Sequence, residues 1–120
     1  MSIAVKTDDD KVFVECIDCR STRSGTDWMV AFLSRASVAD VVVDGANGQQ
    51  ILADAMKDAK LKPPMLPTVK QIISFNSAFE QGIFSKKLCH AGQPSLTQVA
   101  SNCEHRAIGN NGGFGYRSIL

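Results

Sequence analysis

The first twenty residues carry apolar side chains in two runs that suit β-strands. Residues 2–6 and 11–20 form extended segments, and residues 7–10 between them contain three aspartates that favour a hairpin turn. In the second segment the alternate positions on both faces are mostly apolar, which predicts an interior strand. The chain is therefore expected to open with an antiparallel pair of strands.

Apolar residues at helical spacing predict four helices further along the chain. Thr26 is a suitable N-cap for the first, and Pro94 or Ser95 can start the last. The predicted ranges are residues 26–37, 47–60, 69–84, and a short helix from residue 94 to about residue 103.

The segments between these helices are predicted from turn residues and prolines. Prolines on either side of Met65 and Leu66 leave room only for a short strand near a sheet edge, and residues 88–94 are expected to form a loop. Residues 104–118 predict a hairpin with its turn at residues 110–113. This order predicts one mixed α/β domain over residues 1–120, with at least one right-handed parallel crossover.

The segment from residue 39 to residue 45 is the most informative one for function. A β-branched run at residues 41–43 ends in Asp44 and Gly45, and a helical pattern follows. This arrangement predicts a buried parallel strand that brings Asp44 to the carboxyl edge of a sheet, where ligand and metal sites form in open α/β folds. The alternative is a simple turn or helix N-cap at Asp44.

Composition narrows the possible functions. Thirteen Lys and Arg balance twelve Asp and Glu, so any contact with DNA must be local rather than driven by a global basic field. No apolar run approaches the length of a membrane span, and the N-terminus lacks a signal-peptide pattern, so an intracellular protein is expected. Four cysteines are too few for a disulfide scaffold, and no structural disulfide is expected.

Several motifs together resemble the nuclease domain of the phage terminase large subunit, of the type found in actinobacterial phages and prophages. The resemblance spans nearly the whole chain and depends on the order and spacing of its motifs. The motifs are Phe13-Val14-Glu15-Cys16, Gly25-Thr26-Asp27-Trp28, Val41-Val42-Val43-Asp44-Gly45, Leu88-Cys89-His90-Ala91-Gly92-Gln93-Pro94-Ser95-Leu96, and Arg106-Ala107-Ile108-Gly109 before a Gly-rich turn.

The resemblance implies an α/β fold with an RNase H-like mixed sheet and flanking helices, which is incomplete here, together with a C-terminal hairpin. It also implies endonucleolytic cleavage of concatemeric double-stranded DNA during genome packaging, with Mg or Mn ions held by carboxylates. Asp44 matches the acidic residue at the end of the strand after the first helix, so it is the expected metal ligand and catalytic residue. Implied partners are the portal and the terminase small subunit, in the cytoplasm of a bacterial host.

The chain departs from the family pattern at both ends. The family's first metal-binding aspartate lies on a strand upstream of residues 2–6, and its last lies after the C-terminal hairpin; neither has a counterpart here. No Gly-rich phosphate-binding loop of an ATPase is present either. We therefore expect a partial nuclease domain, with an incomplete fold and weak or no cutting activity alone. An inactive prophage remnant is the alternative.

Other acidic residues and a group of basic ones are further candidates. Glu15 could face Asp44 across the sheet and help to bind a metal, or it could be an ordinary solvent-facing glutamate. The aspartates at residues 8–10 suit a solvated turn better than a cation site. The candidates for contact with DNA phosphates are Lys86, Lys87, His90, Arg106 and Arg117. For the lysines and arginines the alternative is scattered solubilising charge, and for the histidine it is a capping role.

A zinc- or DNA-binding module is the rival hypothesis. It depends on Cys16 and Cys19, on Cys89 with His90, and on Cys103 with His105. The first pair lies in a predicted strand, where residues three apart project to opposite faces, and the second half lacks a regular ligand spacing.

A different expectation concerns self-association: an exposed sheet edge beside the N-terminal hairpin would favour a homodimer.

Overall fold

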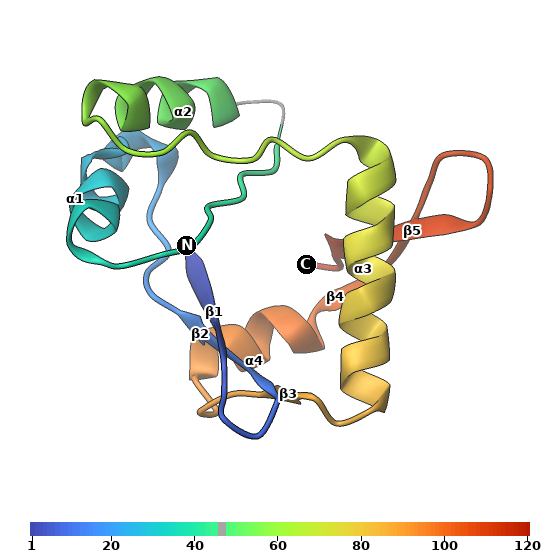
Figure 1. Ribbon diagram of the computed structural model, residues 1–120. Helices are drawn as coiled ribbons and strands as arrows, with labels where there is room; N and C mark the ends of the chain where they lie inside the picture. Colours follow the sequence, from blue (N-terminus) through green and yellow to red (C-terminus); the bar gives the residue numbers. More distant parts are fainter. Residues whose placement is uncertain (46–47) are drawn as a thin grey trace. The chain divides into compact units, whose positions relative to one another are not determined.

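The chain is an α/β protein with four α-helices and two small sheets among residues 1–45 and 48–120, which the computed structural model describes (Figure 1). These residues divide into two compact units. The first unit consists of Met1–Cys19 and Val69–Leu120, and the second consists of Arg20–Thr68. No helix within the described ranges is long and apolar enough to cross a membrane.

A three-stranded sheet organises the first unit. β1 (Ser2–Lys6) pairs antiparallel with β2 (Val12–Cys16), and β2 pairs in parallel with β3 (Leu88–Cys89), so β2 is the central strand. The predicted opening hairpin and the interior position of its second strand are both confirmed. The prediction of a loop over residues 88–94 is wrong at its start, because the carbonyl of Lys87 accepts the Val12 N–H at 2.7 Å and begins a parallel ladder.

The side-chain amide of Gln93 continues this parallel ladder where β3 has ended. Its Oε1 accepts the backbone N–H of Cys16 at 2.8 Å, and its Nε2 donates to the Cys16 carbonyl at 3.0 Å. A side-chain amide presents one donor and one acceptor side by side, like a peptide group. Gln93 therefore satisfies the last backbone groups of β2 without a further residue of strand, immediately before α4 (Pro94–Ser101) begins.

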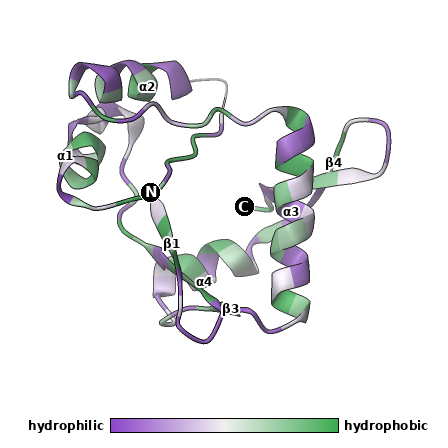
Figure 2. Cartoon of the chain, viewed as in Figure 1, coloured by the Kyte–Doolittle hydropathy of each residue, from purple (hydrophilic) through white to green (hydrophobic). Residues whose placement is uncertain are grey.

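The rest of the first unit is a helix and a hairpin. α3 (Val69–Phe84) has the bounds that its apolar spacing predicts, and it carries hydrophobic and hydrophilic residues along its length (Figure 2). β4 (Cys103–Ile108) and β5 (Gly113–Ser118) form the predicted C-terminal hairpin, a separate two-stranded sheet. α3 packs closely on β5: a Cβ at Gly113 would lie only 2.6 Å from Cδ1 of Ile73, so the glycine permits this approach.

The second unit contains a short 3-10 helix (Thr22–Ser24), α1 (Asp27–Arg35) and α2 (Gln49–Asp58). Thr26 occupies the N-cap position of α1 as predicted, but its side chain makes no capping hydrogen bond. The predicted start of the second helix, Asn47, lies outside the described residues. The small core of this unit consists of Leu33, Leu52 and Met56, against which residues of α1 and of the following extended segments pack.

The prediction of a buried strand over residues 41–43 is wrong. The segment forms one parallel bridge, between Val42 and Met65, and the Val42 side chain is 53% exposed. Val41 and Val43 on either side of it pack against the core of α1 and α2. Within this unit one face of the segment is thus covered and the other is not, which is the pattern of a half-buried strand.

Candidate functional site

Asp44 lies directly after the parallel bridge of the second unit. The Val43 N–H donates to the Met65 carbonyl at 3.0 Å, and the Met65 N–H donates to the Val41 carbonyl at 2.8 Å. The Asp44 side chain is exposed, and its Oδ1 accepts the Gly45 N–H at 2.8 Å. The carboxylate therefore stands at the carboxyl end of a parallel pairing, with its second oxygen available to a ligand.

Glu15, the second predicted catalytic residue, lies in the first unit on β2. It is half-buried and stands opposite Ile3 on β1. Its predicted cooperation with Asp44, which belongs to the second unit, stays a prediction.

Two-metal hydrolysis needs several acidic side chains around ions about 4 Å apart. In the ranges that the structure describes, no three His, Cys, Asp or Glu side chains are grouped so that they could hold a metal ion. Asp44 could thus supply one carboxylate ligand, but these residues alone do not fit a two-metal site.

Two of the cysteine thiols and both histidine rings of the zinc hypothesis have other contacts. All four cysteines are free thiols. The Cys89 thiol donates to the Val12 carbonyl at 3.6 Å, and the Cys103 thiol donates to the Ala100 carbonyl at 3.3 Å. Nδ1 of His90 accepts the Gly92 N–H at 3.0 Å, which is the local capping role that was the alternative for this residue.

Lys86 and Lys87 form the C-terminal cap of α3. Lys86 has a φ of 56° in the left-handed region, and its N–H donates to the Ile83 carbonyl at 3.1 Å. The Lys87 N–H donates to the Gly82 carbonyl at 2.9 Å. This is the Schellman pattern, which leaves the backbone fixed and both ammonium groups on exposed side chains. Two of the five predicted phosphate contacts are therefore consecutive, exposed residues at the capped end of a helix.

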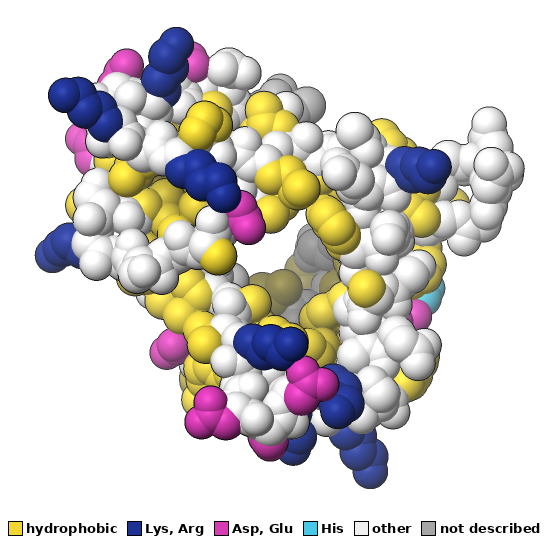
Figure 3. Space-filling view, in the orientation of Figure 1, with side chains coloured by type: hydrophobic (Ala, Val, Ile, Leu, Met, Phe, Trp, Pro, Cys, Tyr) yellow, Lys and Arg dark blue, Asp and Glu magenta, His cyan; other side chains and the backbone are white. Residues whose placement is uncertain are grey.

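The two arginines among the predicted phosphate contacts lie on the C-terminal hairpin. Nε and Nη2 of Arg117 both donate to Oε1 of Glu104 on the facing strand, at 2.7 and 2.6 Å. This ion pair already occupies part of the guanidinium. Arg106 is exposed and stands opposite Gly115. On the sides of the two units that Figure 3 shows, Lys and Arg side chains lie among acidic side chains.

A polar cluster that the sequence did not suggest joins α3 to the C-terminal hairpin. Oε1 of Glu80 accepts a hydrogen bond from the Tyr116 hydroxyl at 2.8 Å and contacts Nε2 of His105. His105 and Tyr116 are a directly opposed pair across the hairpin. The His105 ring stacks on Phe114, with centroids 4.3 Å apart and planes inclined by 17°. One carboxylate therefore holds two side chains from two strands.

The electrostatics of this cluster follow from its hydrogen bonds. Donation by Tyr116, and then by His105, holds the pKa of Glu80 below its ordinary value. Burial, reinforced by the hydrogen bond to the Glu80 carboxylate, raises the pKa of Tyr116 to about 12. Both shifts favour a charged Glu80 and a neutral Tyr116 in the folded protein at neutral pH.

The contribution of the Glu80 cluster to stability should decline in acid. Because the folded pKa of Glu80 lies below its ordinary value, its stabilising effect is present above about pH 4.5 and is lost as the pH falls through the lowered pKa. We expect Glu80→Gln to lower the melting temperature at pH 7, and to lower it progressively less as the pH falls below 4.5 and through the lowered pKa of Glu80. Thermal melts followed by circular dichroism measure this difference. Asp58→Asn, an exposed carboxylate on α2, is the control and should show no such pH-dependent difference.

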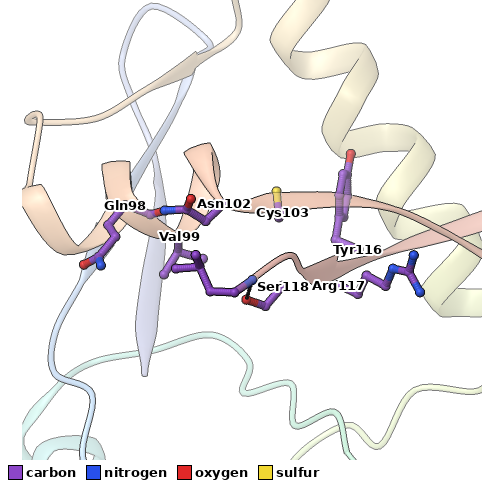
Figure 4. Close-up of a pocket in the computed structure, with 8 residues that line it drawn as sticks. Gln98, Val99, Asn102, Cys103, Tyr116, Arg117 and Ser118 are labelled. Atoms are coloured by element: carbon purple, nitrogen blue, oxygen red, sulfur yellow. Dashed lines mark hydrogen bonds between the residues drawn. The ribbon is translucent and has the colours of Figure 1, made fainter.

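A shallow pocket of about 350 Å³ lies beside this cluster in the first unit. The end of α4 and the strands β4 and β5 form its walls, and Figure 4 shows Cys103 and Tyr116 projecting to the same side of the hairpin. The lining residues are Gln98, Val99, Asn102, Cys103, Tyr116, Arg117, Ser118 and Leu120. Most of the lining surface is apolar, which leaves the pocket few groups that could orient a polar ligand.

Comparison of the sequence with protein-family models, and of the chain with curated proteins and solved structures, found no match.

Proposed function

We propose that this chain acts as part of a nuclease of the terminase large-subunit type, with Asp44 as one carboxylate ligand of a Mg or Mn ion. The observation that carries the proposal is the position of Asp44: an exposed carboxylate directly after a parallel bridge, followed by Gly45 and then by a helix. The motif order of the whole chain, which resembles that family, adds support.

An RNase H-like fold is part of the same proposal. It is supported by the antiparallel β1–β2 hairpin, by the parallel pairing of β2 with β3, and by the helix that follows Asp44. A divalent ion held there would supply Lewis acidity and activate water. The part that this chain's own residues perform is to hold an oxygen ligand in place: the Gly45 N–H fixes one oxygen of Asp44 and leaves the other exposed.

Contact with the DNA backbone is assigned to the basic residues of the first unit. Lys86 and Lys87 support this best, because the described residues pair neither ammonium group with a carboxylate and the helix cap fixes their backbone. Arg106 is exposed as well. Arg117 is a weaker candidate, since Glu104 competes with phosphate for its guanidinium.

Manganese binding tests the role of Asp44 separately from DNA cleavage. Mn(II) is paramagnetic, so titration into labelled protein should broaden the amide resonances of residues 43–45 before others if Asp44 is the ligand. We expect Asp44→Asn to abolish this selective broadening. Asp58→Asn removes an equal charge from an exposed site of the same unit and should leave it intact. Uniform broadening, or selective broadening that survives Asp44→Asn, would contradict the assignment.

Cleavage of plasmid DNA with Mn(II) tests the proposed activity. Cutting that requires both the ion and Asp44 supports the nuclease proposal, whereas cutting that Asp44→Asn leaves unchanged would refute the role of Asp44. Stoichiometric, tight zinc in the purified protein would instead favour the zinc-module alternative. No contact in the first unit favours that alternative at present, since His105 is held by Glu80 and the Cys103 thiol donates to a helix carbonyl.

A further inference from the structure

β1 is an open edge of the three-stranded sheet in the first unit. The ladder register pairs Ser2 with Cys16 and Lys6 with Val12, and the bonds that flank it run from the Ile17 N–H to the Met1 carbonyl and from the Thr7 N–H to the Lys11 carbonyl. Backbone groups of successive residues in a strand point to opposite sides. The backbone groups of the odd-numbered residues of β1 therefore bond to β2. The backbone groups of Ser2, Ala4 and Lys6 point away from the sheet.

The two edges of this sheet differ in how they are completed. Beyond the short β3, the Gln93 side chain supplies the missing donor and acceptor to Cys16. At the opposite edge, no strand of the described first unit pairs with the side of β1 that faces away from β2. β1 also lacks proline and carries a single charged residue, Lys6, so it has few of the features by which proteins protect an exposed edge.

We propose that β1 pairs with β1 of a second copy of this chain, antiparallel and about a two-fold axis at Ala4. In that register Ala4 faces Ala4 of the other copy, and Ser2 faces Lys6. These are the residues whose backbone groups point outward, so the pairing forms about six ladder hydrogen bonds. The result is one continuous sheet of six strands, three from each copy.

The side chains of β1 suit this register. On one face Ile3 stands opposite Val5 of the other copy, and Val5 is 50% exposed in the single chain. Cross-strand pairs of β-branched apolar residues are among those that stabilise antiparallel sheets. On the other face two alanines meet at the axis, and each lysine faces a serine, so no like charges are opposed. A shift by one residue would instead bring inward-bonded backbone groups to the interface, where they have nothing left to donate or accept.

Substitutions at Ala4 test the pairing without disturbing the single chain. Ala4 is exposed, and its N–H points away from β2, so Ala4→Pro removes central ladder bonds at a position where an edge strand tolerates proline. We expect the full-length protein to dimerise with rising concentration in sedimentation velocity runs. Ala4→Pro should raise the dimer dissociation constant about tenfold or more while the circular dichroism spectrum stays the same.

A charge pair at the same position provides an internal control. Ala4→Lys and Ala4→Glu each place two like charges at the two-fold axis and should each be monomeric, whereas an equimolar mixture should form a heterodimer. Hydrogen exchange provides a second measurement: the amides of Ala4 and Lys6 should become protected in the wild-type protein as its concentration rises. A monomer at all concentrations, or a dimer that persists unchanged in Ala4→Pro, would overturn the proposal.

Discussion

Met56→Ala should lower the free energy of unfolding by about 2–5 kcal/mol, the range for removing a large buried apolar side chain. Met56 is almost fully buried, at 1% exposed, and it packs with Leu33 and Leu52 between α1 and α2. The core here has so few members that the surrounding residues can compensate little for the cavity. Chemical denaturation followed by circular dichroism measures the loss.

Two substitutions on α2 serve as controls for Met56→Ala. Met56→Leu nearly conserves volume and should cost less than about 1.5 kcal/mol. Ile51→Ala removes an apolar side chain that is 66% exposed, so its effect should be small. If Met56→Ala destabilised the protein no more than Ile51→Ala does, the core cluster would not hold this unit together.

Gln93→Leu should destabilise the first unit by about 2–6 kcal/mol, since two half-buried backbone groups lose their partners and each such loss costs about 1–3 kcal/mol. The substitution keeps an apolar stem of similar length but removes both the acceptor of the Cys16 N–H and the donor to the Cys16 carbonyl. Denaturant titration measures the stability, and hydrogen exchange at the Cys16 amide reports directly on the lost bond.

Gln93→Glu separates the two hydrogen bonds. A carboxylate keeps an acceptor for the Cys16 N–H but has no proton for the Cys16 carbonyl, so an intermediate loss of stability is expected. Gln98→Leu on α4 is the matched control, because Gln98 is exposed and its hydrogen bonds are made by its backbone carbonyl. Equal effects of Gln93→Leu and Gln98→Leu would show that the strand-like bonding of Gln93 adds nothing.

The local elements were predictable because their signals are local. Residues 2–6 and 11–20 around an aspartate-rich turn indicate a hairpin, and the apolar spacing of α3 gives both of its ends. Pro94 starts α4 for the same kind of reason, since proline suits the first turn of a helix. The glycines of the C-terminal turn likewise belong to the hairpin itself: Gly109 and Gly112 have φ values of 69° and 77°.

The contacts that join distant segments were not predictable in this way. β3 is only two residues long, too short for any periodicity, and exists because β2 lies beside it. Asp44 could be recognised as a candidate ligand from the β-branched run before it, but the extent of burial of that run was overestimated, since its exposure depends on what α1 and α2 cover. The pattern of apolar residues shows which face of a segment is apolar, but it does not show how much of each face the neighbouring elements cover.

Sequence patterns alone predicted the four helices, the two hairpins and the place of Asp44 directly after residues 41–43. These depend on turn residues, caps and the spacing of apolar positions over a few residues. The folded contacts added two features: Gln93 completes the ladder of β2, and Glu80 contacts both His105 and Tyr116. Each depends on hydrogen-bonding groups that lie 25 or more residues apart in the chain. Short-range sequence patterns do not show which distant groups meet.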